Sequence, residues 1–187
     1  MLLYGMSSHG QDIVAIHRRV HGRQPLYMID DNPNLGMLAD DEIRQVPCWV
    51  GINNPHQRAE LVRKHGLIGA RPLVDPSAIV GIGCDLGPGV VVAPNATLLT
   101  SVVLGSHSHA NYNSHMTRCS IGDFSSIAPG VTICGDVTIG TECTIGANAV
   151  VCDRVTIGDN VIVGAGAIVP PLSVVPSGSI VRGVWKS

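Results

Sequence analysis

The chain has 187 residues, and its 12 Lys and Arg against 14 Asp and Glu give a formal net charge of −2. This near-neutral balance carries no basic signal for nucleic acid or for an anionic membrane, so neither is expected as a partner. Apolar residues make up 45% of the chain and aromatic residues only 3%, so the core must be built from aliphatic side chains. The length fits one or two small domains.

The cysteines and the hydrophobic stretches indicate a compartment. The six cysteines form no CxxC pair, and the chain does not start with a basic segment followed by an apolar one. We therefore expect a reduced, cytoplasmic protein. No apolar run approaches the roughly 20 residues that span a bilayer, which favours a soluble chain.

The first part of the chain, residues 1–73, alternates strand and helix patterns. Apolar strands are predicted at residues 1–4 and 26–29, on either side of an amphipathic helix that starts after residue 10. A further strand is predicted at residues 46–51 and a helix at residues 55–65. This β-α-β order predicts a small parallel sheet with a ligand crevice at the carboxyl ends of its strands.

Two polar groups lie at those predicted strand ends. Ser7, Ser8 and His9 stand between Gly5 and Gly10, where backbone amides and a helix start are able to hold a phosphate or a nucleotide base. Asp30-Asp31 follows the second strand, where a carboxylate is placed to accept from ribose hydroxyls. The alternatives are an ordinary tight turn and a turn cap.

From Val80 onward an aliphatic residue recurs every six positions. The first series is Val80, Leu86, Val92, Leu98, Leu104, Ala110 and Met116, and the second is Ile121, Ile127, Ile133, Ile139, Ile145, Val151, Ile157 and Val163. A fixed count of six predicts a triangular coil of short parallel strands with a narrow axis that excludes aromatic rings. Between Val80 and Val181 only Tyr112 and Phe124 are aromatic, which agrees with this prediction.

The two series are out of step by one residue, because Met116 and Ile121 stand five positions apart. In a stacked coil a missing residue must distort a corner or displace a strand, and such irregularities often mark functional sites. His107, His109 and His115 lie beside this break. His109 and His115 hold the same hexad position, so we expect them at adjacent corners of one coil.

The repeat resembles that of the left-handed β-helix acyltransferases. With residues 5–10, Asn111-Tyr112-Asn113 and residues 121–130, the chain more narrowly resembles the sugar acetyltransferases of the sialic-acid and bacillosamine type. The resemblance implies an α/β plus β fold, with a small Rossmann-like nucleotide-sugar-binding domain at residues 1–73 and a left-handed parallel β-helix at residues 74–187. It also implies binding of acetyl-CoA and a homotrimer.

The implied activity is transfer of an acetyl group from acetyl-CoA to the amino group of a nucleotide-linked sugar, in the biosynthesis of lipopolysaccharide or another surface glycan. Sugar O-acetylation and a catalytically impaired nucleotide-sugar-binding protein are the alternatives. The resemblance assigns the nucleotide sugar to Gly5, Ser7, Ser8, His9, Gly10, Asp30 and Asp31. It assigns acetyl-CoA to Asn113, Ser126, Gly135, Gly146, Ala147, Gly164 and Ala165, although a stacked coil requires small residues at several of these positions in any case.

The general base is the point at which the chain departs from the family. The family's usual histidine falls on Thr117 or Arg118, and neither serves, because an arginine stays protonated and a threonine hydroxyl is too weak a base. Three explanations stay open: the shortened corner brings His115 into the vacated place beside Arg118, a partly neutral amine reacts without a protein base, or the activity is lost. The catalytic candidates are therefore His115 and Arg118, with N-acetylation preferred to O-acetylation.

A zinc enzyme is the alternative from another class. Carbonic anhydrases of the gamma type share the β-helix and bind zinc through three histidines, but the spacing of His107, His109 and His115 differs from theirs. No metal is therefore expected.

Overall fold

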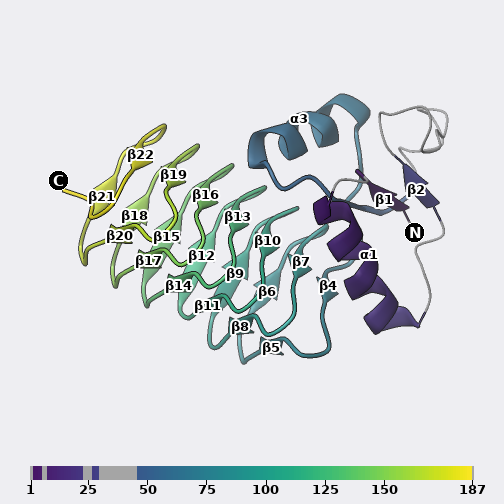
Figure 1. The fold of residues 1–187 in the computed structure, drawn as a ribbon, viewed down its shortest axis with the longest axis horizontal. Helices are drawn as coiled ribbons and strands as arrows, with labels where there is room; N and C mark the ends of the chain where they lie inside the picture. Colours follow the sequence, from purple (N-terminus) through teal and green to yellow (C-terminus); the bar gives the residue numbers. More distant parts are fainter. Residues whose placement is uncertain (1, 6–7, 23–26, 30–45, 187) are drawn as a thin grey trace.

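The computed structural model describes residues 2–5, 8–22, 27–29 and 46–186 and shows a small α/β unit at one end of a long coil (Figure 1). The α/β unit contains β1 (Leu2–Tyr4), α1 (Ser8–His21), β2 (Tyr27–Ile29), β3 (Cys48–Val50) and α3 (Pro55–His65). Its sheet has the order β2-β1-β3, and both strand pairs are parallel. The predicted β-α-β order and small parallel sheet are therefore confirmed.

Glycines allow α1 to begin close to the strand ends. A Cβ atom on Gly10 would lie 2.0 Å from the carbonyl oxygen of Gly5, and one on Gly51 would lie 2.5 Å from the Cα atom of Gly10. No other residue type fits at such distances. The paired glycines of the first turn thus pack the amino end of α1 onto the carboxyl ends of β1 and β3.

The limits of α3 follow from its sequence. The Asn54 side chain caps the helix by accepting from the backbone N–H of Gln57 at 3.0 Å, and Pro55 follows at a position where its missing N–H costs nothing. Gly66 ends the helix in the left-handed conformation, with φ of 58°. The capped start fixes Asn54 and Gln57 at the edge of the cavity described below.

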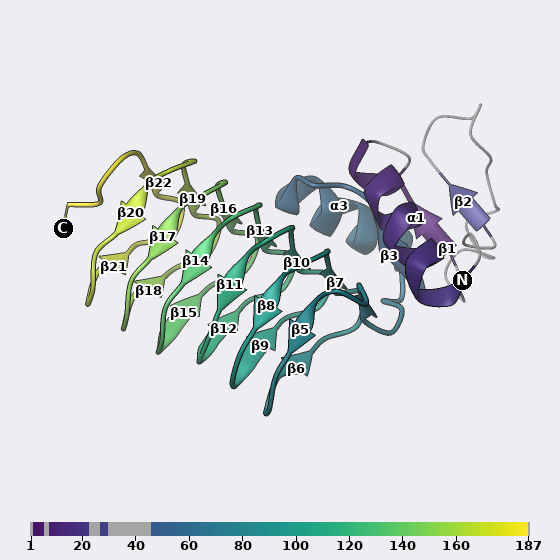
Figure 2. The same cartoon turned by 60° about the horizontal axis from the view of Figure 1, so that its bottom comes forward.

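The rest of the chain coils into a parallel β-solenoid of the left-handed type, built from three sheets (Figure 2). We name each sheet after its strand in the middle of the chain. The β10 sheet contains β4 (Leu73–Val74), β7 (Val91–Val92), β10 (His109–Ala110), β13 (Ser126–Ile127), β16 (Thr144–Ile145), β19 (Ile162–Val163) and β22 (Ile180–Val181). The β11 sheet contains β5 (Ile79–Val80), β8 (Thr97–Leu98), β11 (His115–Met116), β14 (Thr132–Ile133), β17 (Val150–Val151) and β20 (Ile168–Val169). The β12 sheet contains β6 (Asp85–Leu86), β9 (Val102–Leu104), β12 (Cys119–Ile121), β15 (Val137–Ile139), β18 (Thr156–Ile157) and β21 (Val174–Val175).

The five-residue break shortens one corner and leaves the strands paired. Val91 pairs with His109, 18 positions on, whereas His109 pairs with Ser126, only 17 positions on. Two residues, Thr117 and Arg118, separate β11 from β12, whereas three separate β8 from β9. The predicted distortion of a corner is confirmed, and it absorbs the missing residue without displacing a strand.

The aliphatic residues of the hexad fill the solenoid axis. Leu98, Met116, Ile133 and Val151 are at most 1% exposed, and they point inward from successive strands of the β11 sheet. The first residue of each two-residue strand points outward instead. His109 and His115 hold such outward positions at the starts of β10 and β11, so the prediction that they lie at corners is wrong.

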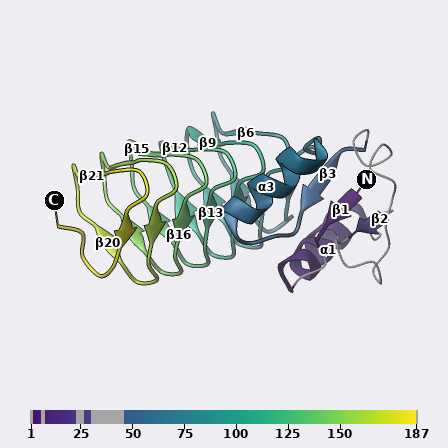
Figure 3. The same cartoon turned by 90° about the horizontal axis from the view of Figure 1, so that it is seen from above.

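The α/β unit is packed onto the β10 sheet at the start of the solenoid (Figure 3). Leu3, Ile13 and Trp49 share a buried cluster with Leu73 and Val91, which are outward residues of that sheet. The predicted boundary between residues 73 and 74 falls within β4. Because α1 and α3 cover the outward positions of β7, β10 and β13, side chains that a bare solenoid would expose are buried here.

Two ion pairs tie the helices to the solenoid. Arg19 in α1 contacts the buried carboxylate of Asp75 at 3.1 Å, and Arg63 in α3 contacts Glu142. His56 contacts the same glutamate at 3.0 Å. Neither described helix is long and apolar enough to cross a membrane.

Candidate functional site

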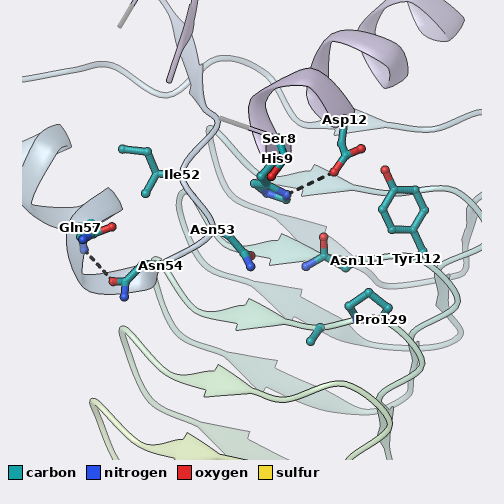
Figure 4. Close-up of a pocket in the computed structure, with 11 residues that line it drawn as sticks. Ser8, His9, Asp12, Ile52, Asn53, Asn54, Gln57, Asn111, Tyr112 and Pro129 are labelled. Carbon is teal, nitrogen blue, oxygen red and sulfur yellow. Dashed lines mark hydrogen bonds and ion pairs between the residues drawn. The ribbon is translucent and has the colours of Figure 1, made fainter. Parts of the chain in front are cut away.

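A cavity of about 540 Å³ opens where the α/β unit meets the solenoid (Figure 4). Its walls come from the start of α1, from the segment that leads into α3, and from the corner that follows β10 and β13. The lining residues are Ser8, His9, Asp12, Ile52, Asn53, Asn54, Gln57, Asn111, Tyr112, Ala128 and Pro129. This volume is typical of small-molecule sites, and the lining is rich in amide and hydroxyl groups.

A histidine pair joins the two units in one wall of this cavity. His9 Nε2 lies 2.9 Å from His109 Nδ1, so one ring donates a hydrogen bond to the other. The His9 side chain is 13% exposed, whereas His109 is 1% exposed beneath α1. His9 therefore presents its other nitrogen, Nδ1, on the side of the cavity, and there the Asp12 carboxylate lies 3.9 Å away.

The surroundings keep the pair uncharged. Burial lowers the pKa of His9 below its ordinary value, and the positive charge of Arg58 lowers it further, while Asp12 acts in the opposite sense. Burial and Arg58 also lower the pKa of His109 well below its ordinary value. At neutral pH His9 is thus a neutral imidazole, which is the form that accepts a proton.

Among the described residues that line the cavity, Asp12 is the only aspartate, glutamate, lysine or arginine. Its side chain is 47% exposed. It accepts a hydrogen bond from Tyr112, whose pKa is raised to about 12 by burial first and then by Asp12. A carboxylate beside a neutral imidazole attracts an ammonium or N–H group and repels a phosphate.

The nucleotide-sugar residues implied by the resemblance divide into three groups. Ser8 and His9 line the cavity, and their contact with a nucleotide sugar stays a prediction. Gly5 and Gly10 lie behind it, in the close contact between strand and helix. Ser7, Asp30 and Asp31 lie outside the described residues, so their roles stay predictions.

Several of the acetyl-CoA residues extend one wall of the cavity. Ala128 and Pro129 follow β13, and the equivalent positions after β16 and β19 are Gly146-Ala147 and Gly164-Ala165, because Ile127, Ile145 and Val163 pair in register. These four residues form a strip of small side chains along the same corner. Asn113 is exposed at that corner one coil earlier, with φ of 54°.

The other two acetyl-CoA candidates have protein partners. The Ser126 hydroxyl is buried under α3, where it accepts from Arg58 at 2.9 Å and donates to the carbonyl oxygen of Asn53 at 2.9 Å. The Gly135 amide donates to the Asp153 carboxylate at 3.0 Å, on a different corner of the solenoid. In this arrangement neither group faces the cavity, and their predicted roles stay predictions.

His115 and Arg118 lie on another side of the solenoid. His115 is exposed on β11 between Thr97 and Thr132 of the neighbouring strands. Arg118 occupies the shortened corner and pairs with Asp136 at 3.3 Å. Neither residue lines the cavity that contains His9.

The sequence-based candidates did not include Asp12, Arg58 or Gln57. His109 was placed beside the five-residue break and weighed as a zinc ligand, but it was not assigned to the sugar site. The polar outward position of His109, between Val91 and Ser126 of neighbouring strands, was the one available signal. It was insufficient because nothing in the hexad pattern says which sheet a helix will cover. Among the described residues no group of three or more His, Cys, Asp and Glu side chains is arranged to hold a metal ion.

Comparison with known proteins agrees with this architecture. Residues 118–153 and 136–171 match the bacterial transferase hexapeptide (six repeats) family. GDP-perosamine N-acetyltransferase of Escherichia coli O157:H7 is 32% identical over 147 residues, which cover 68% of this chain and 66% of that enzyme.

Solved structures share the fold over nearly the whole chain. A variant of perosamine N-acetyltransferase from Caulobacter crescentus, in complex with CoA and GDP-perosamine, superposes with a TM-score of 0.87 at 22% identity, over 97% of this chain and 96% of that one. The acetyltransferase domain of PglB from Neisseria gonorrhoeae, in complex with acetyl coenzyme A, gives 0.81 at 20% identity, over 96% and 93%. The matching repeat and the 32% identity to the E. coli enzyme show that the chain belongs to the hexapeptide-repeat family of bacterial transferases, and the solenoid agrees with this.

Proposed function

We propose that this protein transfers an acetyl group from acetyl-CoA to the amino group of a nucleotide-linked amino sugar. The observation that carries the proposal is the neutral His9–His109 pair in the wall of a polar cavity that also contains Asp12. The relative from E. coli is named for this reaction on GDP-perosamine, and the C. crescentus enzyme binds CoA together with GDP-perosamine. Both similarities support a nucleotide sugar as the acceptor.

The cavity suits the amino sugar rather than its phosphates. Asp12 attracts the ammonium form of the amine, and the amide groups of Asn53 and Gln57 offer hydrogen bonds to sugar hydroxyls. We assign the diphosphate and the nucleoside to the α/β unit, at the amino end of α1, because the positive end of a helix dipole favours an anion. This is the nucleotide-binding role that a Rossmann-like unit would perform.

His9 is the proposed general base. When His9 donates from Nε2 to His109, its Nδ1 lone pair is free on the cavity side and receives the amine proton as the nitrogen attacks the thioester carbonyl carbon. The carbon–sulfur bond then breaks, and the CoA thiolate takes up a proton. Asp12, 3.9 Å from Nδ1, stabilises the imidazolium ion that forms.

The thioester is proposed to approach along the strip of Gly146, Ala147, Gly164 and Ala165. Small side chains leave room for the pantetheine arm, and the strip leads from the last coils toward Pro129 and the cavity. We further propose that the protein is a cytoplasmic homotrimer active in surface-glycan biosynthesis. In such a trimer His115 and Arg118, which are exposed on another face, would be available to a neighbouring copy.

The test is turnover. The purified protein is incubated with acetyl-CoA and a panel of GDP-, UDP- and dTDP-linked 4-amino sugars, and thiol release and the acetylated product are measured. Acetylation of at least one amino sugar, and none of the matching sugar that carries a hydroxyl in place of the amine, is the expected result. Absence of thiol release with every amino sugar would overturn the proposal, and acetylation of the hydroxyl sugar would replace it by O-acetylation. Light scattering checks the trimer.

A further inference from the structure

Arg58 is a buried cation at the junction between α3 and the solenoid. The residue is 0% exposed, and the acceptors of its guanidinium among the described residues are all oxygen atoms of carbonyl and hydroxyl groups. On its own side of the junction it binds the carbonyl oxygens of Ile52 and Asn53. On the solenoid side its acceptors are the carbonyl oxygens of His107, at 2.8 Å, and Phe124, together with Ser126 Oγ at 2.9 Å.

None of these acceptors is a carboxylate, so among the described residues the charge of Arg58 is solvated by dipoles and not neutralised by an ion pair. Burying a charge in this way is expensive, and α3 already has Arg63 and His56 to attach it to Glu142. A role in docking alone therefore does not explain why a cation stands here.

The acceptors of Arg58 in the solenoid lie on both sides of one residue, His109. His107 precedes His109 by two positions, and Ser126 is its partner in the register of β10 and β13. The guanidinium is thus held beside His109, and its charge acts on both rings of the His9–His109 pair. It also fixes the Asn53 carbonyl, and with it the segment that forms the opposite wall of the cavity.

The charged and titratable groups around the pair come from every element packed against it. Asp12 faces His9 from α1, and Tyr112 at the solenoid corner donates a hydrogen bond to Asp12. Arg58 comes from α3, and His107 lies in the corner before β10. Asp123 faces His107 from the corner before β13. Among the described residues, Arg58 is the one arginine or lysine whose charge lowers the pKa of all three of His9, His107 and His109, and burial has the larger effect on each.

We propose that Arg58 is a positioning residue that holds the His9–His109 pair in its uncharged, hydrogen-bonded form, so that His9 is ready to accept a proton at neutral pH. The guanidinium does so in two ways. Its positive charge opposes a second positive charge on either ring, and its hydrogen bonds hold the backbone on both sides of His109. The role of His9 as a base rests on the proposed function, whereas the uncharged form of the two rings does not.

The experiment compares Arg58→Met, which removes the charge, with Arg58→Lys, which keeps it and offers fewer donors. Ring titrations of His9 and His109 are followed by NMR of the ¹⁵N-labelled protein without substrate, and kcat/KM is measured against pH. In the Met variant the His9 midpoint is expected to rise by more than half a unit, a gain of about threefold in proton affinity, and the acid limb of kcat/KM to rise with it. In the Lys variant both stay within about 0.2 units of the wild type, although thermal stability falls.

Equal His9 midpoints in the Met variant and the wild type would overturn the inference, because a purely structural arginine leaves the titration unchanged. A second measurement uses the wild-type protein and so does not depend on the folding of a variant. At pH 7 the ring ¹⁵N shifts are expected to show that His9 and His109 are both uncharged, and a charged ring would overturn the inference. Since the ring titrations use no substrate, their failure is distinguished from a failure to find acetyl transfer.

Discussion

His9 in α1 and His109 in β10 stand one hundred positions apart in the chain, and their rings are joined by a hydrogen bond of 2.9 Å. The contact links the two units of the protein at the cavity. A shift of α1 relative to the solenoid would break this hydrogen bond. The position of α1 on the solenoid therefore controls whether His9 is oriented to act as the base.

Replacing His9 by Gln is expected to lower kcat/KM by about 10²- to 10⁴-fold, because Gln keeps a donor toward His109 but has no basic nitrogen. The measurement is thiol release from acetyl-CoA with the best amino sugar. His56→Gln is the matched control, since His56 is an exposed histidine of α3 outside the cavity, and its variant keeps the wild-type rate.

The same assay separates the two candidate bases. His115→Gln is expected to keep kcat/KM within a few-fold of the wild type, because His115 does not line the cavity. A loss of 10²-fold or more in this variant, with little change in His9→Gln, would instead make His115 the base. Within a trimer it would then act on the cavity of a neighbouring copy.

Asp12→Asn is expected to lower kcat/KM for the amino sugar by about 10- to 100-fold, mainly through KM, since a hydrogen bond to a charged group is worth about 1.5–3 kcal/mol. Asp85→Asn, which changes an exposed carboxylate on β6, is the control and has no effect. The Tyr112 phenol reports the same change without substrate: its pKa, about 12, falls in the Asp12→Asn variant. Ultraviolet titration against Tyr112→Phe measures this shift, and an unchanged phenol would contradict the contact.

Stability is expected to fall as the solution is acidified below about pH 6.5. Burial lowers the pKa of His107 to about 4, and those of His9 and His109 are lowered as well. Between the folded and the unfolded pKa the unfolded chain binds more protons, so the free energy of unfolding decreases as pH falls and is greatest above the unfolded value. For His107 alone the difference is at most about 3 kcal/mol.

Denaturant unfolding at several pH values tests this dependence. His107→Gln is expected to reduce the slope between pH 4 and pH 6.5. A wild-type stability that does not vary across this range would contradict the buried, uncharged state of these histidines.

Two glycines of the solenoid should respond differently to alanine. A Cβ on Gly146 would lie 2.5 Å from the backbone nitrogen of Ala165, so Gly146→Ala must push two coils apart and is expected to cost about 1–3 kcal/mol. A Cβ on Gly135 would meet only the end of the flexible Arg118 side chain, at 2.0 Å, which can move away. Thermal unfolding compares the two variants, and the Michaelis constant for acetyl-CoA is expected to rise only in Gly146→Ala.

The sequence alone determined the solenoid, because a six-residue period can be satisfied only if aliphatic side chains fill one narrow axis coil after coil. It also indicated the small parallel sheet and the shortened corner after Met116, since both follow from local spacing. The same spacing places Ala128, Gly146-Ala147 and Gly164-Ala165 at one corner of successive coils.

Only the tertiary structure decided where the cavity lies. The hexad makes the three faces of the solenoid nearly equivalent, so it cannot say which outward residue a helix will bury. Packing of α1 and α3 on one face buries His109 and Arg58 and leaves His115 exposed, and burial lowers the pKa of His109. The chemistry of the site therefore depends on a contact between segments far apart in the chain, which no local pattern encodes.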